Sequence, residues 1–183
     1  MENKTFKLPS KFAQKWLTAL RSGEFEQLEG QLIDCTIAYP KDGGEIEIVK
    51  SDTKKGCCLG VAAVVLGATD LELRNHGMPY EVNQEVWDRI GYPKILQEKS
   101  LQSIGITPLP VILANLNDGL TLSWANNVMK EYPNLKFHKL PERYFYDIEV
   151  DDEVDGEPML EYYSFEDIAK FIEDNVEFED EGV

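Results

Sequence analysis

One stretch dominates the pattern of apolar and polar positions along the chain. Residues 56–67 form its one long uncharged apolar run, Gly-Cys-Cys-Leu-Gly-Val-Ala-Ala-Val-Val-Leu-Gly. A helix that is apolar on all sides is a buried helix, and this run is far shorter than the ~20 residues needed to cross a bilayer. The pattern therefore predicts a central core helix over 57–66, around which the other elements pack.

Residues 11–21 have the spacing of an amphipathic helix. Phe12, Trp16 and Leu20 recur every four residues, so they share one face. Ser10, directly before this stretch, is the residue type that caps helix N-termini. We predict a helix with its apolar face in the core and residues 1–9 as an arm in front of it.

The C-terminal region carries a second clear helix signal. Ser164 is followed three residues later by Asp167, which predicts a capping box. Ile168, Phe171 and Ile172 then give the helix an apolar face, and residues 176–183 are expected to be a frayed acidic tail. Weaker helical patterns cover residues 82–90, 111–118 and 124–132.

Strand signals cluster in the first third of the chain. Residues 45–50 alternate apolar and polar, and 40–44 are turn residues, so 31–39 and 45–50 predict a hairpin. Residues 104–110 look extended, and 135–163 resemble an irregular β insertion with a hairpin turn at 155–156.

The predicted fold class is α+β, with three or four helices around the 57–66 helix and a small antiparallel sheet. We expect one domain over residues 1–183, with an insertion at about 119–163 and an acidic C-terminal tail. At 183 residues and 43% hydrophobic content, such a chain can bury a core without disulfides.

The net charge of −16 is concentrated at one end. Residues 144–183 hold 16 Asp and Glu residues and one lysine, whereas residues 1–143 hold 17 Lys and Arg against 18 Asp and Glu. A chain with this neutral-to-acidic charge balance is poorly suited to bind a phosphate backbone, so we expect no direct binding of nucleic acid. The acidic part is read as a solvated face or, alternatively, as a surface that mimics nucleic acid.

Composition also bears on location. The first residues lack the apolar segment of a signal peptide, and no run is long enough to span a membrane. Three cysteines, two of them adjacent, make a poor disulfide framework and suit a reducing compartment. The expected location is the cytoplasm.

Catalytic and metal-binding patterns are weak. Cys57 stands where a helix begins, but a cysteine nucleophile needs a base, and nothing in the sequence ties His76 or His138 to it. The acidic run at 151–155 departs from the EF-hand pattern, and no zinc or phosphate-loop spacing occurs. We expect no catalytic residues, no metal site and no cofactor, with packing as the role of Cys57 and Cys58.

Two short polar segments could bind a ligand. Arg21-Ser22-Gly23 places a fork-shaped cation, a hydroxyl and an open backbone at a helix end near Trp16, which suits a phosphate and a stacked base. The alternative is a helix C-terminus with Arg21 beside the helix dipole and Trp16 in the core. Asn117-Asp118 is either a turn or a hydrogen-bonding edge for the same ligand.

Three segments together resemble a widespread family of small, uncharacterised phage and prophage proteins. They are Trp16–Gln27, which matches W-x-x-A-L-R-S-G-x-[YF]-x-Q, the C-C-L-G-V centre at 57–61, and residues 113–118 taken with 164–169, which look like the family's L-x-x-L-N-D and S-F-x-E-I-A motifs. This chain departs from the family by separating the last two motifs with residues 119–163. After Gln27 it also carries 28–32, which is less basic than the family's usual stretch.

The resemblance implies a binding protein made during infection, and if a phage encodes the chain, its expected location is the cytoplasm of the host cell. Our leading hypothesis is a non-catalytic counter-defence protein that sequesters a small nucleotide immune signal, a sponge, with its site favoured at a homo-oligomer interface. The residues expected to contact the ligand are Trp16, Arg21, Ser22, Gln27, Asn117 and Asp118. The alternatives are an acidic inhibitor or DNA mimic that binds a host defence nuclease, and a cysteine enzyme that uses Cys57.

Overall fold

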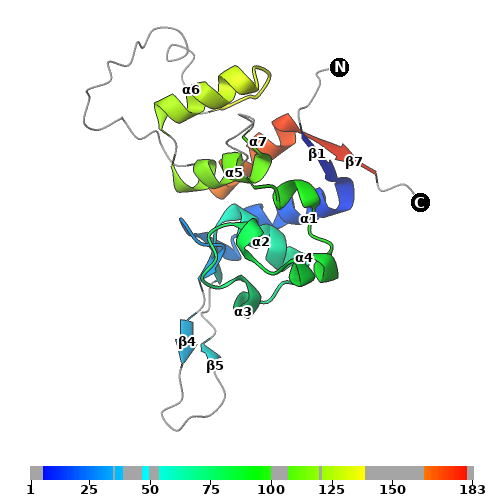
Figure 1. Cartoon of the computed structure of the whole chain (residues 1–183), viewed down its shortest axis with the longest axis vertical. Coiled ribbons are helices and arrows are strands. Elements are labelled where there is room, and N and C mark those ends of the chain that lie inside the picture. Colours follow the sequence, from blue (N-terminus) through cyan, green and yellow to red (C-terminus); the bar gives the residue numbers. More distant parts are fainter. Residues whose placement is uncertain are drawn as a thin grey trace.

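The computed structural model describes residues 6–34, 36–38, 47–49, 54–99, 107–119, 121–138 and 163–180. It is a mixed α+β structure, as predicted (Figure 1). Its helices are α1 (Ser10–Arg21), α2 (Cys58–Val65), α3 (Asp70–Leu73), α4 (Gln84–Ile90), α5 (Leu109–Asp118), α6 (Leu122–Glu131) and α7 (Phe165–Asn175), with 3-10 turns η1 (Pro79–Glu81) and η2 (Lys94–Leu96). Its strands are β1 (Phe6–Pro9), β2 (Phe25–Gln27), β3 (Ile33–Asp34), β4 (Thr36–Ala38), β5 (Glu47–Val49), β6 (Lys54–Gly56) and β7 (Val176–Glu179).

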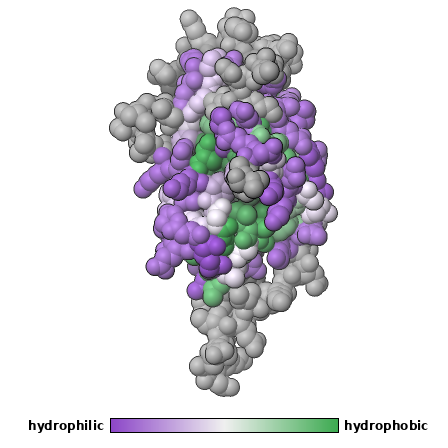
Figure 2. Space-filling view, turned by 90° about the vertical axis from the view of Figure 1, so that its right-hand side faces the viewer, coloured by the Kyte–Doolittle hydropathy of each residue, from purple (hydrophilic) through white to green (hydrophobic). Residues whose placement is uncertain are grey.

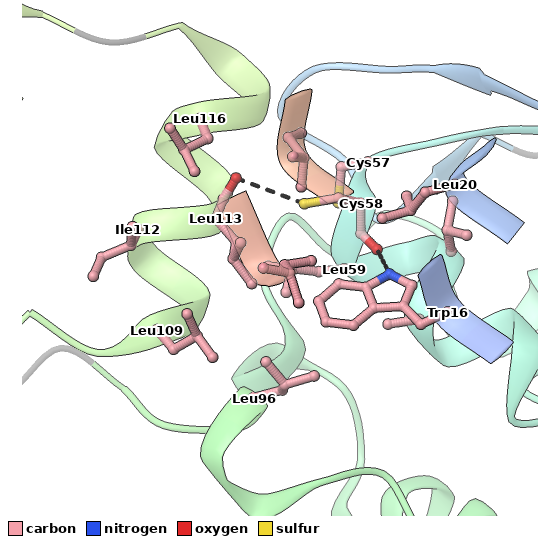
Figure 3. Close-up of a cluster of buried hydrophobic side chains, with 14 of the residues drawn as sticks. Trp16, Leu20, Cys57, Cys58, Leu59, Leu96, Leu109, Ile112, Leu113 and Leu116 are labelled. Atoms are coloured by element: carbon pink, nitrogen blue, oxygen red, sulfur yellow. Dashed lines mark hydrogen bonds between the residues drawn. The ribbon is translucent and has the colours of Figure 1, made fainter. Parts of the chain in front are cut away.

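Helix α2 lies at the centre of the hydrophobic core, at the position where the sequence predicts a buried helix. Residues 58–63 are buried on every side of it. Helices α1 and α5 pack against α2, and α7 packs against both α1 and α5. Figure 3 shows this core, with side chains of α1 and α5 meeting around Cys58 and Leu59. Helices α1 and α5 bury their apolar faces against α2, and α7 buries its apolar face against α1 and α5.

Two glycines, one at the end of β6 and one in the first turn of α2, allow a close approach of backbone to backbone. A Cβ added at Gly60 would lie 1.7 Å from the carbonyl oxygen of Leu32, and one at Gly56 would lie 2.6 Å from the same atom. The chain at Leu32 therefore runs directly against the start of α2. The backbone N–H of Cys57 donates to this oxygen at 3.1 Å, which fixes the contact.

The two ends of the described chain pair with each other, contrary to the predicted arm and frayed tail. Strand β1 runs parallel to β7, with Phe6 opposite Val176 and Pro9 opposite Glu179. Phe6, Leu8 and Val176 are buried. Alternate residues of each strand therefore face the core, and their burial holds both segments in place. The expectation of a frayed tail over residues 176–183 is wrong for residues 176–179, which form β7.

The sheet prediction is right in part. Strands β4 and β5 form the expected antiparallel pair. However, β3 belongs to another sheet, in which β6 pairs in parallel with β2 and antiparallel with β3. The described strands are therefore partly parallel rather than all antiparallel. The parallel pairings join segments far apart in sequence, which a local strand pattern does not reveal.

Several helix boundaries also differ from the sequence expectations. Pro9 occupies the N-cap position of α1, and Ser10 is its first helical residue. Leu109 and Pro110, expected to be extended, begin α5, because proline is tolerated in the first helical turn. The capping box of Ser164 and Asp167 is confirmed.

The predicted insertion is described only at its borders. Residues 135–138 form no strand, and Leu135 and Phe137 are buried against the core. The expected turns at 40–44 and 155–156 lie outside the described residues. Within the part of the chain that is described, no helix is long and apolar enough to cross a membrane.

The contact of Gly60 with Leu32 can be tested by substitution. Gly60→Ala is expected to destabilise the protein by about 3 kcal/mol or more, because the backbone at Leu32 must move. Gly30→Ala is the matched control: Gly30 has a φ of +69° and nothing within 4 Å of the added Cβ, so it should cost only about 1 kcal/mol. Urea unfolding followed by circular dichroism measures both. Equal losses would contradict the close approach.

Candidate functional site

Three of the residues that the sequence singles out, Gln27, Asn117 and Asp118, converge on one place, at the start of α2. The polar junction, as we name it, joins the segment after β2, the N-terminus of α2 and the C-terminus of α5. Its members are Gln27, Leu28, Gly30, Cys58, Asn117 and Asp118. These positions are far apart in the sequence, so the fold brings together three of the motifs that carried the family resemblance.

Asn117 is the centre of this junction and is fully buried. Its Oδ1 accepts a hydrogen bond from the backbone N–H of Cys58 at 3.2 Å. Its Nδ2 donates to the carbonyl of Leu28 at 2.7 Å and to Oδ1 of Asp118 at 2.8 Å. Because the first N–H groups of a helix have no partner within the helix, Asn117 caps α2 from a neighbouring helix. Its amide is fully engaged inside the protein.

Gln27 and Asp118 extend the junction toward the surface. Gln27 Nε2 donates to the carbonyl oxygens of Tyr163, at 2.8 Å, and Asn117, at 3.3 Å. Asp118 Oδ1 accepts from the backbone N–H of Gly30 at 3.1 Å. Both residues are only partly buried. They tie the segment after β2 to the start of α7 and the end of α5, and each retains some contact with solvent.

Trp16 lies in the core rather than at the surface. Its side chain is fully buried, and its indole Nε1 donates to the carbonyl of Cys58 at 2.9 Å (Figure 3). One face of its ring stacks on Phe12, with ring centroids 5.5 Å apart. Cys58 is thus held through its N–H by Asn117 and through its carbonyl by Trp16. A buried tryptophan with its N–H satisfied has the alternative, core role that the sequence left open.

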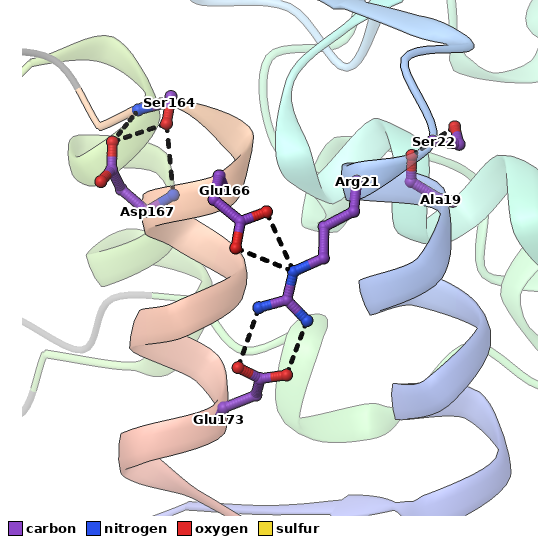
Figure 4. A network of polar contacts seen from close by, with 7 residues as sticks. All are labelled: Ala19, Arg21, Ser22, Ser164, Glu166, Asp167 and Glu173. Carbon is purple, nitrogen blue, oxygen red and sulfur yellow. Dashed lines mark hydrogen bonds and ion pairs between the residues drawn. The ribbon is translucent and has the colours of Figure 1, made fainter.

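Arg21 is bound by two carboxylates of α7 (Figure 4). Its Nη1 and Nη2 donate to the two oxygens of Glu173 at 2.6 and 2.9 Å, and its Nε donates to Glu166 at 3.1 and 3.0 Å. The hydrogen bond with Glu173 raises the pKa of Arg21 above its ordinary value and lowers the pKa of Glu173. Ser22 Oγ donates to the carbonyl of Ala19 at 2.8 Å, so its hydroxyl closes the end of α1.

The two described cysteines are buried, and burial favours the protonated thiol of each. Burial raises the pKa of Cys57 to about 12 and the pKa of Cys58 well above its ordinary value. Cys58 Sγ donates weakly to the carbonyl of Leu113 at 3.6 Å. His138 lies 2.7 Å from Asp174 instead. A thiolate is the reactive form of cysteine, so this environment supports packing for both residues.

Metal ligands do not gather in the described residues, where no three His, Cys, Asp or Glu side chains are placed to hold an ion.

The apolar surface is also modest. Figure 2 shows a face on which polar residues surround a smaller set of apolar ones. Leu71 and Tyr80, 46% and 39% exposed, are the large apolar side chains named as exposed in the described part. Exposed apolar residues in such numbers are normal on protein surfaces.

The acidic face, as we name it, is the surface formed by α7 and β7. Residues 163–180 hold seven Asp and Glu residues and one lysine. Lys7 on β1 bridges two of them, lying 2.5 Å from Glu179 and 3.6 Å from Glu177. Arg21 from α1 pairs with Glu173, and His138 and Lys136 interact with Asp174. The carboxylates remain in excess, and Glu177 and Glu179 are exposed on the same side of β7.

Sequence reasoning missed how this face is built. The acidic composition of the C-terminal part was visible, but the pairing of β7 with β1 was not, so residues 177 and 179 were placed in a frayed tail. The alternation of Val176 and Phe178 with two glutamates was the available signal.

Searches for similar proteins found that no protein-family model, curated protein or solved structure matches the chain. Function is therefore inferred from its own residues.

The role of Asn117 can be tested by removing its amide. Asn117→Ala leaves the N–H of Cys58 and the carbonyl of Leu28 without their partner, so we expect a loss of about 2–4 kcal/mol in the free energy of unfolding. The control is Asn115→Ala on the same helix. The side chain of Asn115 is half-buried and bonds only to the carbonyl of Val111, so its loss should stay within about 0.5 kcal/mol.

Asn117→Asp adds a dependence on pH. A buried carboxylate beside Asp118 has a pKa raised above its unfolded value of about 3.9. Above that pH the variant therefore loses stability. The difference between its free energy of unfolding and that of the wild type grows from pH 4 to pH 7. Urea titrations at both pH values measure the deficit. A constant deficit would mean that the side chain at 117 reaches solvent.

Cysteine accessibility gives a second check. Cys57 and Cys58 should react with iodoacetamide on the order of 10²-fold more slowly in the native protein than in urea. Peptide mapping by mass spectrometry follows each residue separately from Cys35, which lies outside the described residues. Rapid native labelling of Cys57 would contradict the burial and favour the cysteine-enzyme alternative.

Proposed function

We propose that this chain is a non-catalytic binding protein whose acidic face engages a basic protein partner. The excess of carboxylates on α7 and β7 carries the proposal. Such a face is complementary to the cationic groove of a protein that binds nucleic acid. In the phage setting that the motifs suggest, the partner is a host defence nuclease and the chain is a counter-defence inhibitor.

The geometry supports this inhibitor better than the nucleotide sponge. A sponge at the predicted site would use Trp16 to stack a base and Arg21 to bind phosphate. Trp16 is buried, and Arg21 is held between two carboxylates, which repel a phosphate. Ser22, Gln27, Asn117 and Asp118 make hydrogen bonds within the protein. A nucleotide at this place would have to displace several of these contacts.

Inhibition of DNA cleavage tests the proposal. A purified bacterial defence nuclease is mixed with increasing amounts of the chain, and cleavage of a plasmid is measured from about 50 to 300 mM NaCl. We expect stoichiometric inhibition that weakens as salt rises, because exposed charges are screened. The double variant Glu177→Gln, Glu179→Gln should inhibit less well.

The matched control removes the same charge elsewhere. Glu85→Gln with Asp88→Asn, both exposed on α4, also deletes two negative charges but leaves the acidic face intact. If both double variants lose inhibition equally, net charge rather than the acidic face is responsible. Absence of inhibition across defence nucleases would contradict the proposal.

Native mass spectrometry of the chain from infected or defence-expressing cells separates the two hypotheses. An intact nucleotide released on denaturation supports the sponge and contradicts the inhibitor. A stoichiometric complex with a basic host nuclease supports the inhibitor.

A further inference from the structure

We propose that residues 132–138, which we name the strap, lock the pairing of β1 with β7, so that the strap and these two strands open and close as one unit. The strap follows α6. The ring of Tyr132 lies 5.3 Å from the ring of Phe6 on β1, measured between centroids, and Lys136 bonds to Asn175, the residue directly before β7. This inference concerns a conformational device of the fold and does not depend on the proposed function.

The pair of β1 and β7 needs support from outside the two strands. In the described part of the chain its sheet has two strands, and an isolated pair of strands is only marginally stable in water. The two strands are parallel, which is slightly less stable per residue than an antiparallel pairing. Phe6 lies opposite Val176 at the start of both strands. The strap supports this end of the sheet at both strands, through the ring of Phe6 and through Asn175.

Asn175 binds the strap as a neighbouring strand would. Its Oδ1 accepts a hydrogen bond from the backbone N–H of Lys136 at 2.7 Å, and its Nδ2 donates to the carbonyl of Lys136 at 3.1 Å. Its Nδ2 also donates to the carbonyl of Phe171 at 2.8 Å. Asn175 is buried, and a buried amide that loses its partners is costly. Departure of the strap and movement of Asn175 are therefore coupled, and the movement passes along the chain into Val176.

The rest of the strap is held by the last turns of α7. Leu135 and Phe137 are buried. The ring of Phe137 lies 5.4 Å from the ring of Phe171, and Nε2 of His138 lies 2.7 Å from Oδ2 of Asp174. Apolar and polar contacts thus fix the strap to the same helix end from which β7 begins.

Helix α2 is held by different contacts. The backbone of Cys58 is bonded by Trp16 and Asn117, on α1 and α5, whereas the strap contacts β1 and the end of α7. Parts of a protein that share few contacts can open separately, with different free energies. The strap and the two strands therefore form a unit that opens while the centre of the core stays closed.

Native-state hydrogen exchange of the full chain, read by mass spectrometry, tests this unit. Asn175→Ala removes the bonds to Lys136. We expect the backbone amides of β1, the strap and β7 to exchange about tenfold faster or more, because a buried N–H and a buried carbonyl lose their partner. The amides of α2 should keep their wild-type rates. Asn115→Ala is the matched control, since it removes the same side chain from α5, where it bonds to the carbonyl of Val111.

Two further variants separate coupling from local damage next to β7. Phe137→Ala breaks the strap at a residue outside both strands and should also speed exchange in β1 and β7. If circular dichroism shows that it does not fold, Phe137→Leu takes its place, because leucine keeps apolar volume but loses the ring contact. Phe6→Leu removes the ring beside Tyr132 from the side of β1. Coupling between two parts is reciprocal, so this variant should speed exchange in the strap.

Unchanged exchange of β1 in both Asn175→Ala and Phe137→Ala would overturn the proposal, because the strap would then act on α7 alone. Equal acceleration in α2 would also overturn it, because the variants would then lower the stability of the whole fold. Faster exchange confined to β1, the strap and β7 would support it. Inhibition of a nuclease enters neither readout, so failure of this inference and failure of the proposed function are distinguishable.

Discussion

The structure depends on the contact between the backbone at Leu32 and the first turn of α2. Gly60 has no side chain at this point, and the Leu32 carbonyl occupies the space that a Cβ would need. The contact leaves the start of α2 without water, so its N–H groups must find partners inside the protein. Cys57 donates to Leu32, and Cys58 donates to Asn117. Packing and hydrogen bonding at this helix end therefore require each other.

This requirement explains why three distant motifs occur together. The indole N–H of Trp16 donates to the carbonyl of Cys58, and the side chain of Asn117 accepts from the backbone N–H of the same residue. Gln27 then connects the segment after β2 to Asn117 and Tyr163. A set of polar residues can look like a ligand site in sequence because buried networks and ligand sites use the same side chains.

The sequence was most informative where one segment decides its own structure. The buried helix over 58–65 and the amphipathic helices α1 and α7 follow from periodicity and capping within a few residues. The parallel pairs β1–β7 and β2–β6 join distant segments. The sequence of either strand alone therefore does not identify its pairing partner. The partners of Trp16, Arg21 and Asn117 are similarly distant. The sequence shows which hydrogen-bonding and charged groups these side chains offer. It does not show whether another part of the protein or a ligand pairs with those groups.

The parallel pairing of β1 with β7 has a mechanical consequence. Force applied through Phe6 and Glu179 would pull the two strands in opposite directions along their length, because β1 leads into α1 and β7 leads out of α7. The hydrogen bonds of the pair would then bear the load together, rather than opening one after another as in a hairpin pulled from its ends. The strands at the two ends of the described fold thus act as a shear clamp against force applied between those ends.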